Sequence, residues 1–128
     1  MATYPARQIG FQCVGYLRAP ITFAMGYTGV TQVGTLPAGA AVLRAYAVVG
    51  TAFNNGSTNS LKIGTVASDA AITAAVALGT IGVASGTIAA NAAVLPAVDT
   101  PIIATGVSTG TAATTGSGVV VVEYLPVP

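Results

Sequence analysis

Residues 41–66 carry the feature that most constrains the fold, an alternation of apolar and other side chains on both sides of a turn signal. Over residues 41–53 most odd positions are apolar, whereas the even positions include Arg44 and Tyr46. A period of two places successive side chains on opposite faces of a β-strand, so we expect the odd positions to face a core. Arg44 and Tyr46 are then candidates for an outward-facing interface.

A turn signal follows this strand. Residues 54–59 read Asn-Asn-Gly-Ser-Thr-Asn, and the Asn-Gly pair tolerates the positive φ values of tight turns. Residues 60–66 return with apolar side chains on either side of Lys62. We therefore predict that residues 41–66 form one long β-hairpin.

In the rest of the chain, turn-forming residues separate short segments that are typical of β-strands. Residues 37–39 (Pro-Ala-Gly) predict a turn, since proline fixes φ early in a turn and glycine supplies freedom later. The valine run that begins at residue 119 predicts a strand buried on both faces. The other expected segments are strands over 21–25, 31–36, 101–107 and 119–125, weak strand or loop over 80–84 and 87–95, and a loop over 108–118.

One segment is more helical in character. Residues 69–78 are rich in alanine, Ser68 or Asp69 can cap the N-terminus, and Gly79 can end the run. Together with the strands, this pattern predicts an all-β fold. We expect a β-sandwich, jelly-roll-like, with seven or eight short strands and one short helical insertion near residues 69–78.

Residues 1–20 read as an N-terminal arm in front of a single β-sandwich domain over residues 21–128. The arm is irregular, with two prolines and two glycines, and it concentrates aromatic and cationic side chains. Exposed apolar residues in such a segment favour contact with another surface. The arm either packs on a neighbouring subunit or forms an ordinary first strand of the same domain. The candidate contact residues are Tyr4, Arg7, Phe11, Tyr16 and Arg18.

Charged side chains are scarce, and this limits the chemistry that the chain can perform. The 128 residues include four Lys+Arg and three Asp+Glu, where an ordinary soluble domain of this length has about 32 charged residues. A net charge of +1 does not supply the basic surface that nucleic-acid binding needs. Histidine is absent, and Cys13 stands alone, so a disulfide, a Cys/His zinc site and most acid–base catalysis are disfavoured. We expect no enzymatic activity, no cofactor and no metal site.

The three carboxylates have structural roles in this interpretation, because none stands in a metal-ligand motif. We expect Asp69 to cap a helix, Asp99 to lie in a turn and Glu123 to form an ion pair. Small side chains dominate the apolar residues, and each stabilises a monomer less than a large side chain does. Association of several copies adds buried area, so we expect a homo-oligomer.

Residues 70–98 contain no charged side chain, which raises the question of a membrane-spanning helix. Glycine, threonine, serine, asparagine and proline interrupt the stretch, and no cation lies near either end to orient it. We therefore expect no membrane segment. The first eight residues lack the basic and apolar regions of a signal peptide.

A longer pattern runs through residues 33–65. It contains Leu-Pro-Ala-Gly-Ala at 36–40, a long strand that ends in Ala-Phe-Asn at 52–54, and a Gly/Thr/Asn loop before Leu-x-x-Gly-Thr at 61–65. A later valine-rich strand ends in Glu123-Tyr124. In these features the chain resembles small β-rich virion proteins that are encoded among the structural genes of tailed bacteriophages.

The resemblance implies a jelly-roll-like capsid decoration (cement) protein or a head-fibre base, commonly trimeric. Such a protein is a non-enzymatic virion component made in the host cytoplasm. It binds the major capsid protein on the outer capsid surface and bridges neighbouring capsid subunits. Two alternatives remain open. A head-fibre or adhesin-type module that binds cell-surface glycan predicts aromatic and polar clusters on loops such as 54–59 and 108–118. A small capsid shell subunit predicts closed particles from this chain alone.

Overall fold

Eight strands and one short 3₁₀ helix account for the regular structure of the computed structural model, which describes residues 14–25, 29–91 and 94–126. The elements are β1 (Gly15–Thr22), η1 (Phe23–Met25), β2 (Val30–Leu36), β3 (Ala41–Thr51), β4 (Thr58–Gly64), β5 (Thr73–Ala77), β6 (Gly82–Ser85), β7 (Thr100–Thr109) and β8 (Ser117–Leu125).

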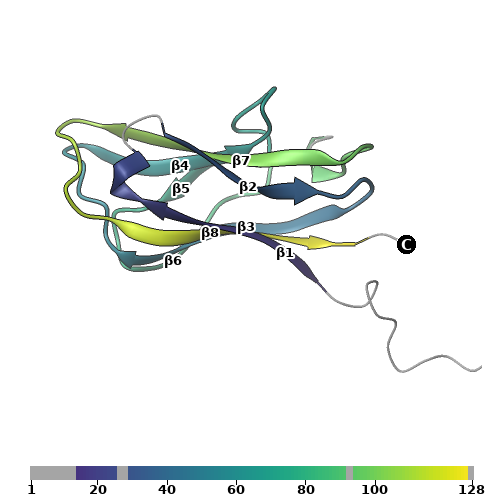
Figure 1. Cartoon of the computed structure of the whole chain (residues 1–128), viewed down its shortest axis with the longest axis horizontal. Helices are drawn as coiled ribbons and strands as arrows, with labels where there is room; N and C mark the ends of the chain where they lie inside the picture. The colour runs from purple at the N-terminus through teal and green to yellow at the C-terminus, as the bar shows by residue number, and fades with distance from the viewer. Residues whose placement is uncertain (1–13, 26–28, 92–93, 127–128) are drawn as a thin grey trace, which may run out of the picture.

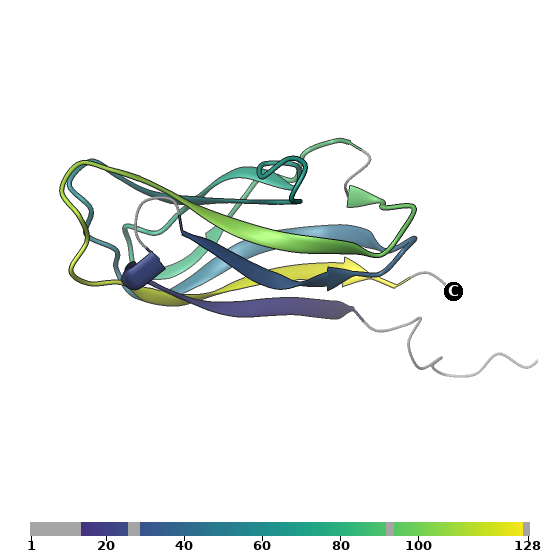
Figure 2. The same ribbon diagram turned by 45° about the horizontal axis from the view of Figure 1, so that its top comes forward.

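The strands form two antiparallel sheets stacked as layers (Figures 1 and 2). Sheet A has the order β1-β8-β3-β6, and sheet B has the order β2-β7-β4-β5. The first strand pairs with the last, the second with the last but one, and so on inward along the chain. These pairs are β1 with β8, β2 with β7, β3 with β6 and β4 with β5. The chain is thus a ribbon doubled back on itself and rolled into two sheets, with β3–β8 and β4–β7 as the added pairings. This arrangement is a jelly roll, and the expected all-β sandwich is confirmed.

The core lies between the sheets and consists mainly of valine, isoleucine, leucine and alanine. Alternate residues of each strand supply it, such as Val120 and Val122 from β8 and Ile102 from β7, all fully buried. Val121 points to the other side of sheet A and is still only 8% exposed. The valine run is therefore buried on both faces, as the sequence predicted.

The hairpin expected over residues 41–66 is wrong. β3 belongs to sheet A, where it lies between β8 and β6, and β4 belongs to sheet B, where it lies between β7 and β5. Residues 52–57 cross from one sheet to the other. The Asn-Gly signal marked a connection correctly, but it did not show which strands pair.

The helical insertion expected near residues 69–78 is also wrong. Residues 73–77 form the edge strand β5, which pairs with β4 and places Val76 opposite Leu61. Leu78 extends the pairing through its backbone N–H, which lies 2.9 Å from the Asn59 carbonyl oxygen. Pairing with β4 and burial of the apolar side chains outweigh the intrinsic helical preference of the alanines, as tertiary contacts commonly do.

The alternation along β3 holds from Ala45 to Val49 and is interrupted at two register shifts with β8, between Val42 and Arg44 and between Val49 and Thr51. Ala45, Ala47 and Val49 face the core, as expected from the odd positions. A register shift between Val42 and Arg44 turns Val42 inward and leaves Leu43 44% exposed. A β-bulge inserts one extra residue, so inward and outward positions exchange on its far side.

The N-terminal arm expected over residues 1–20 overlaps the sandwich. Residues 15–20 belong to β1, which forms one edge of sheet A and pairs with β8 along its whole length. For this portion the structure matches the reading of an ordinary first strand. Tyr4, Arg7, Phe11 and Cys13 lie outside the described residues.

Within the described residues, no helix has the length and apolar character needed to span a membrane.

Two loops are bound together at the end of the sandwich opposite the start of β1 (Figure 1). The Asn54 side-chain oxygen accepts hydrogen bonds from the backbone N–H groups of Thr114 (2.8 Å) and Thr115 (3.1 Å). The Phe53 ring packs directly on Gly116, whose φ is +146°. The loop between β3 and β4 therefore fixes the loop between β7 and β8.

We predict that Gly116→Ala destabilises the fold by about 2–4 kcal/mol, because alanine resists this φ and its Cβ collides with the Phe53 ring. A Cβ at Gly116 would lie 2.6 Å from Cγ of Phe53. Gly50→Ala is the matched control, since a Cβ at Gly50 meets nothing within 4 Å. The free energy of unfolding in urea measures both changes. Equal stability of the two variants would contradict the prediction.

Candidate interaction surface

The outer face of sheet A combines candidate residues from two distant parts of the sequence. In an antiparallel sheet, directly opposite residues point to the same face. Tyr16 of β1 lies opposite Glu123 of β8, which lies opposite Arg44 of β3. Arg18 lies opposite Val121, which lies opposite Tyr46. Tyr16, Arg18, Arg44 and Tyr46 therefore occupy two adjacent rows. With Glu123 they form what we call the tyrosine–arginine face.

Arg44 and Glu123 form an ion pair at the centre of this face. The Glu123 side chain is 7% exposed, whereas the Arg44 side chain is 67% exposed. The Arg44 guanidinium also lies 5.5 Å from the centre of the Tyr46 ring, within the range of a cation–π interaction. The carboxylate is thus covered, and the guanidinium is held in place with one side open to solvent. The ion pair expected for Glu123 is confirmed.

Tyr46 is coupled to the same carboxylate. Burial raises the pKa of the Tyr46 hydroxyl, and the negative charge of Glu123 raises it further. The positive charge of Arg44 acts in the opposite direction. The raised pKa keeps the Tyr46 hydroxyl protonated beside the carboxylate.

Arg18 gives this face a surplus positive charge. The ion pairs among the described residues are Arg44–Glu123 and Lys62–Asp69, so Arg18 is the described cation that has no carboxylate partner. Arg18 is exposed, and in its row Val121 of β8 lies between it and Tyr46 of β3. The face can accept one more carboxylate from another molecule.

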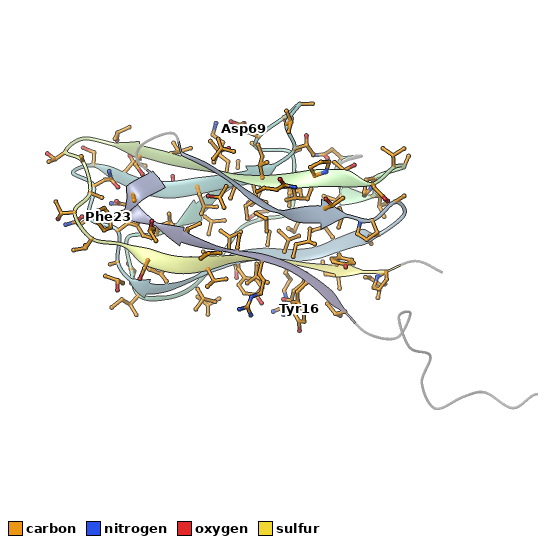
Figure 3. All side chains as sticks on the ribbon, in the orientation of Figure 1. Tyr16, Phe23 and Asp69 are labelled. Carbon is orange, nitrogen blue, oxygen red and sulfur yellow. The ribbon has the colours of Figure 1, made fainter. Side chains whose placement is uncertain are left out.

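Next to the tyrosine–arginine face lies a row of apolar side chains that the sequence did not single out. Pro20, Val119, Val48 and Val83 are opposite one another across β1, β8, β3 and β6, and we call them the apolar row. Val48 is 42% exposed and Val83 is 67% exposed. Val48 stands at an even position of the alternating segment, so its outward position was the one sign of this row that the sequence offered. Tyr16, 59% exposed, points away from sheet B (Figure 3).

Sheet B presents a different outer face. Its ion pair joins Lys62 Nζ to Asp69 Oδ2 at 3.0 Å, and both side chains are partly exposed. Thr58 and Thr109 bond through their hydroxyls at 2.9 Å. Asp69 was expected to cap a helix, and this is wrong, because the segment contains a strand and the carboxylate binds Lys62. Asp99 accepts a hydrogen bond from the backbone N–H of Ala38 in the turn before β3, at 2.8 Å.

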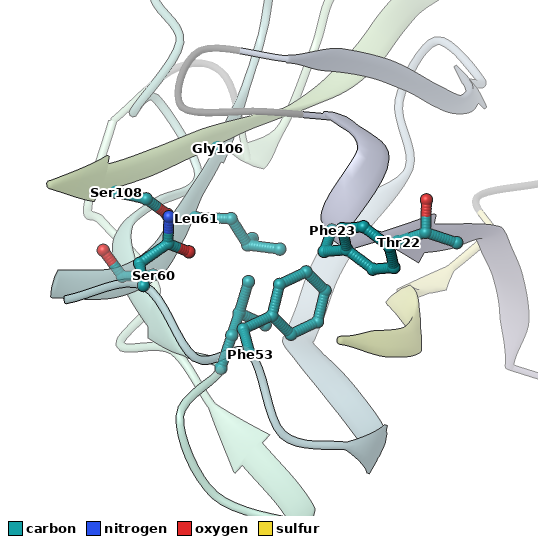
Figure 4. A pocket seen from close by; sticks show the side chains of 9 residues that line it. Thr22, Phe23, Phe53, Ser60, Leu61, Gly106 and Ser108 are labelled. Carbon is teal, nitrogen blue, oxygen red and sulfur yellow. The ribbon is translucent and has the colours of Figure 1, made fainter. Parts of the chain in front are cut away.

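The loop end of the sandwich contains a small pocket between Phe23 of η1 and Phe53 (Figure 4). The volume of this cavity is ≈ 10 Å³, which is about enough for one water molecule. Phe23 also borders a shallower hollow with the hydroxyl-bearing residues Thr115 and Ser117. The fold thus brings an aromatic ring beside loop 108–118, which contains none in its sequence.

Comparison with known proteins gives one informative match. No family model matches the chain, and no curated protein matches it. A chain in the solved structure described as the cyanophage Pam1 capsid asymmetric unit is similar over its length. The TM-score is 0.63 and the identity is 25%, over 100% of this chain and 94% of that chain. The likeness supports a phage virion protein with a structural place in the capsid.

We predict that Arg44→Ala lowers the free energy of unfolding by about 1–3 kcal/mol, because the covered Glu123 carboxylate loses its counter-charge. Glu123→Gln keeps the shape of the side chain and removes the charge. The cost of Arg44→Ala should therefore be smaller in the Glu123→Gln background. Urea denaturation of the four proteins of this cycle measures the coupling, and identical costs in both backgrounds would show that the pair is uncoupled.

Proposed function

We propose that this chain is a non-enzymatic structural protein of a phage virion that binds the outer surface of the capsid and bridges neighbouring capsid subunits. The observation that carries the proposal is the outer face of sheet A. It places an unpaired cation, two tyrosines and an exposed apolar row on one surface. The end-to-end likeness to a chain of a capsid asymmetric unit supports a place in the shell.

The chemistry of this face indicates the chemistry of the partner. Tyrosine and arginine are enriched at the energetically dominant centres of protein interfaces, because they combine apolar area with directed polar contacts. Arg18 and Arg44 together carry two positive charges against the one carboxylate of Glu123. The complementary surface on the major capsid protein therefore carries carboxylates beside apolar side chains.

The outer side of the shell fits this chain better than the genome side. A protein that contacts packaged nucleic acid needs many cations, and this sequence has a net charge of +1. Contact with neighbouring proteins also accounts for the low charge of the whole chain, since interface centres are depleted of charged residues. The mechanism is area burial across two or more shell subunits, which opposes their separation.

The oligomeric state belongs to the same proposal. The resemblance to phage virion proteins implies a trimer, and a trimer presents three copies of the tyrosine–arginine face to one capsid surface. Three weak contacts on one assembly give strong attachment through effective concentration. A shell subunit is the competing function, and assembly of closed particles by this chain alone would replace the decoration role with it.

We predict that Arg18→Glu weakens binding to expanded capsids that lack this chain by at least about tenfold. The variant reverses a charge that forms no ion pair within the described residues, so the fold should keep its stability. Gln32→Glu is the matched control, because it adds a negative charge to exposed Gln32 of β2 in sheet B. Co-sedimentation with capsids measures both. Equal binding of the two variants would remove the tyrosine–arginine face from the proposal.

The arm is tested separately, by deletion of residues 2–13. This deletion leaves β1 complete, since β1 begins at Gly15. We expect weaker capsid binding with an unchanged melting temperature, because the deletion removes Tyr4, Arg7 and Phe11 from the proposed contact. Binding equal to that of the full chain would overturn the contact role of these three residues and leave the tyrosine–arginine face in place.

A further inference from the structure

Four strands form the edges of the two sheets: β1 and β6 in sheet A, and β2 and β5 in sheet B. An edge strand exposes backbone N–H and C=O groups that can pair with another chain. Natural sheets block such pairing with proline, charge, bulges or a covering segment.

β1 is blocked by proline and charge. The Phe23 N–H donates to the Gly116 carbonyl at 3.0 Å, just beyond the end of β1. Hydrogen-bonded pairs alternate along an antiparallel ladder, so this bond places Ala19 and Ile21 in bonded pairs with β8. The backbone of Pro20 then faces the open edge, where it offers no donor. Arg18 faces the same edge.

The two edges of sheet B are protected in other ways. β2 contains a register shift between Gln32 and Gly34 in its pairing with β7. The start of β5 is covered by the segment after β6. Ala89 N–H donates to the Ile72 carbonyl at 2.9 Å, and the Asn91 side-chain amide donates to the Ala71 carbonyl at 2.8 Å.

β6 is short, with four residues, but it has none of these protections. Its four residues contain no proline and no charge, and the nearest charged side chains in the sequence are Asp69 and Asp99. Val83 is 67% exposed, and Ile81 just before the strand is 68% exposed. The ladder with β3 runs from Val49 to Tyr46 without a register shift.

The open backbone groups of β6 can be assigned. The Gly86 N–H donates to the Ala45 carbonyl at 2.9 Å. By the same alternation, Ala84 and Gly82 form bonded pairs with β3. The N–H and C=O groups of Val83 and Ser85 are therefore directed away from β3.

We propose that β6 pairs with β6 of a second copy of this chain, antiparallel and around a two-fold axis at Ala84. The two sheets A then form one continuous eight-stranded sheet. In this pairing the backbone groups of Val83 lie opposite those of Ser85 in the second copy, and the backbone groups of Ser85 lie opposite those of Val83 in the second copy. This contact goes beyond the proposed function, because a three-fold trimer of this chain does not contain a two-fold contact.

A second copy fits this edge for two reasons. An antiparallel edge is complementary to itself under two-fold rotation, so donors meet acceptors without any change of backbone. The edge is also electrically compatible with itself, since residues 70–98 contain no charge that could repel an identical strand. Across the axis the apolar row of each copy meets Ser85 and then Tyr46 of the other copy, because Ser85 lies opposite Tyr46 in the ladder with β3.

The first test compares Val83→Lys with Val30→Lys. A lysine on an edge strand opposes pairing, and Val30 is a similarly exposed valine (58%) on the edge strand β2. By sedimentation equilibrium, the unmodified chain should associate to twice the mass of the species that Val83→Lys forms. The dissociation constant should rise at least about tenfold in Val83→Lys and stay unchanged in Val30→Lys. Equal masses for all three proteins would overturn the proposal.

The second test does not depend on a weakened variant. Residues on the two-fold axis form a non-hydrogen-bonded pair, whose Cα atoms lie about 4.5 Å apart, within the range of a disulfide. Ala84→Cys in a Cys13→Ser background should therefore form a disulfide-linked dimer on oxidation, and Val30→Cys in the same background should not.

Failure of Ala84→Cys to cross-link in a folded protein would overturn the two-fold contact. Absence of self-association in the unmodified chain would also overturn it, even where Val83→Lys binds capsids more weakly, because Val83 belongs to the apolar row of the proposed capsid-binding surface. Neither outcome touches the role of Arg18, so the two proposals fail independently.

Discussion

The position of β8 between β1 and β3 is the interaction on which the rest of the structure depends. Its backbone pairs with β1 and β3, which begin 102 and 76 residues earlier in the chain, and its inward valines Val120 and Val122 are fully buried. The pairing of β1 with β8 brings the two ends of the chain together. The strands between them can then pair in the same order, β2 with β7, β3 with β6 and β4 with β5. The two-sheet sandwich follows from that closure and from the packing of the aliphatic side chains on the inner faces of the sheets.

The same strand organises the outer surface. Glu123 of β8 faces outward between Tyr16 and Arg44, and its carboxylate is covered by the side chains around it. A covered carboxylate needs a counter-charge, which Arg44 supplies through the ion pair. The result is a rigid arrangement of aromatic and cationic groups on a sheet, and such preorganisation lowers the entropic cost of binding.

Several elements could be predicted from the sequence because their signals are local. The alternation along residues 45–49 identified the inward positions of β3, and the turn at 37–39 is present, with Gly39 at a φ of +80°. Arg44 and Tyr46 were placed on the outward face by the same alternation. The apolar row was missed, because its four members come from four strands and become neighbours only through the register of sheet A. The phase change at Leu43 was missed because a bulge leaves no local mark in this sequence.

Local patterns in the sequence indicated most of the strands, and the composition indicated which side-chain chemistry the chain carries. Seven charges, no histidine and one cysteine favour binding through area and a few directed contacts. Only the tertiary structure decided which strands pair. Residues 41–66 have the pattern of a hairpin yet divide between two sheets, and residues 73–77 take the free edge of β4 despite their alanines. The physical reason is that strands pair through backbone groups, which are the same in nearly every residue. Partner choice is therefore set by the burial of the whole core, and not by any single segment.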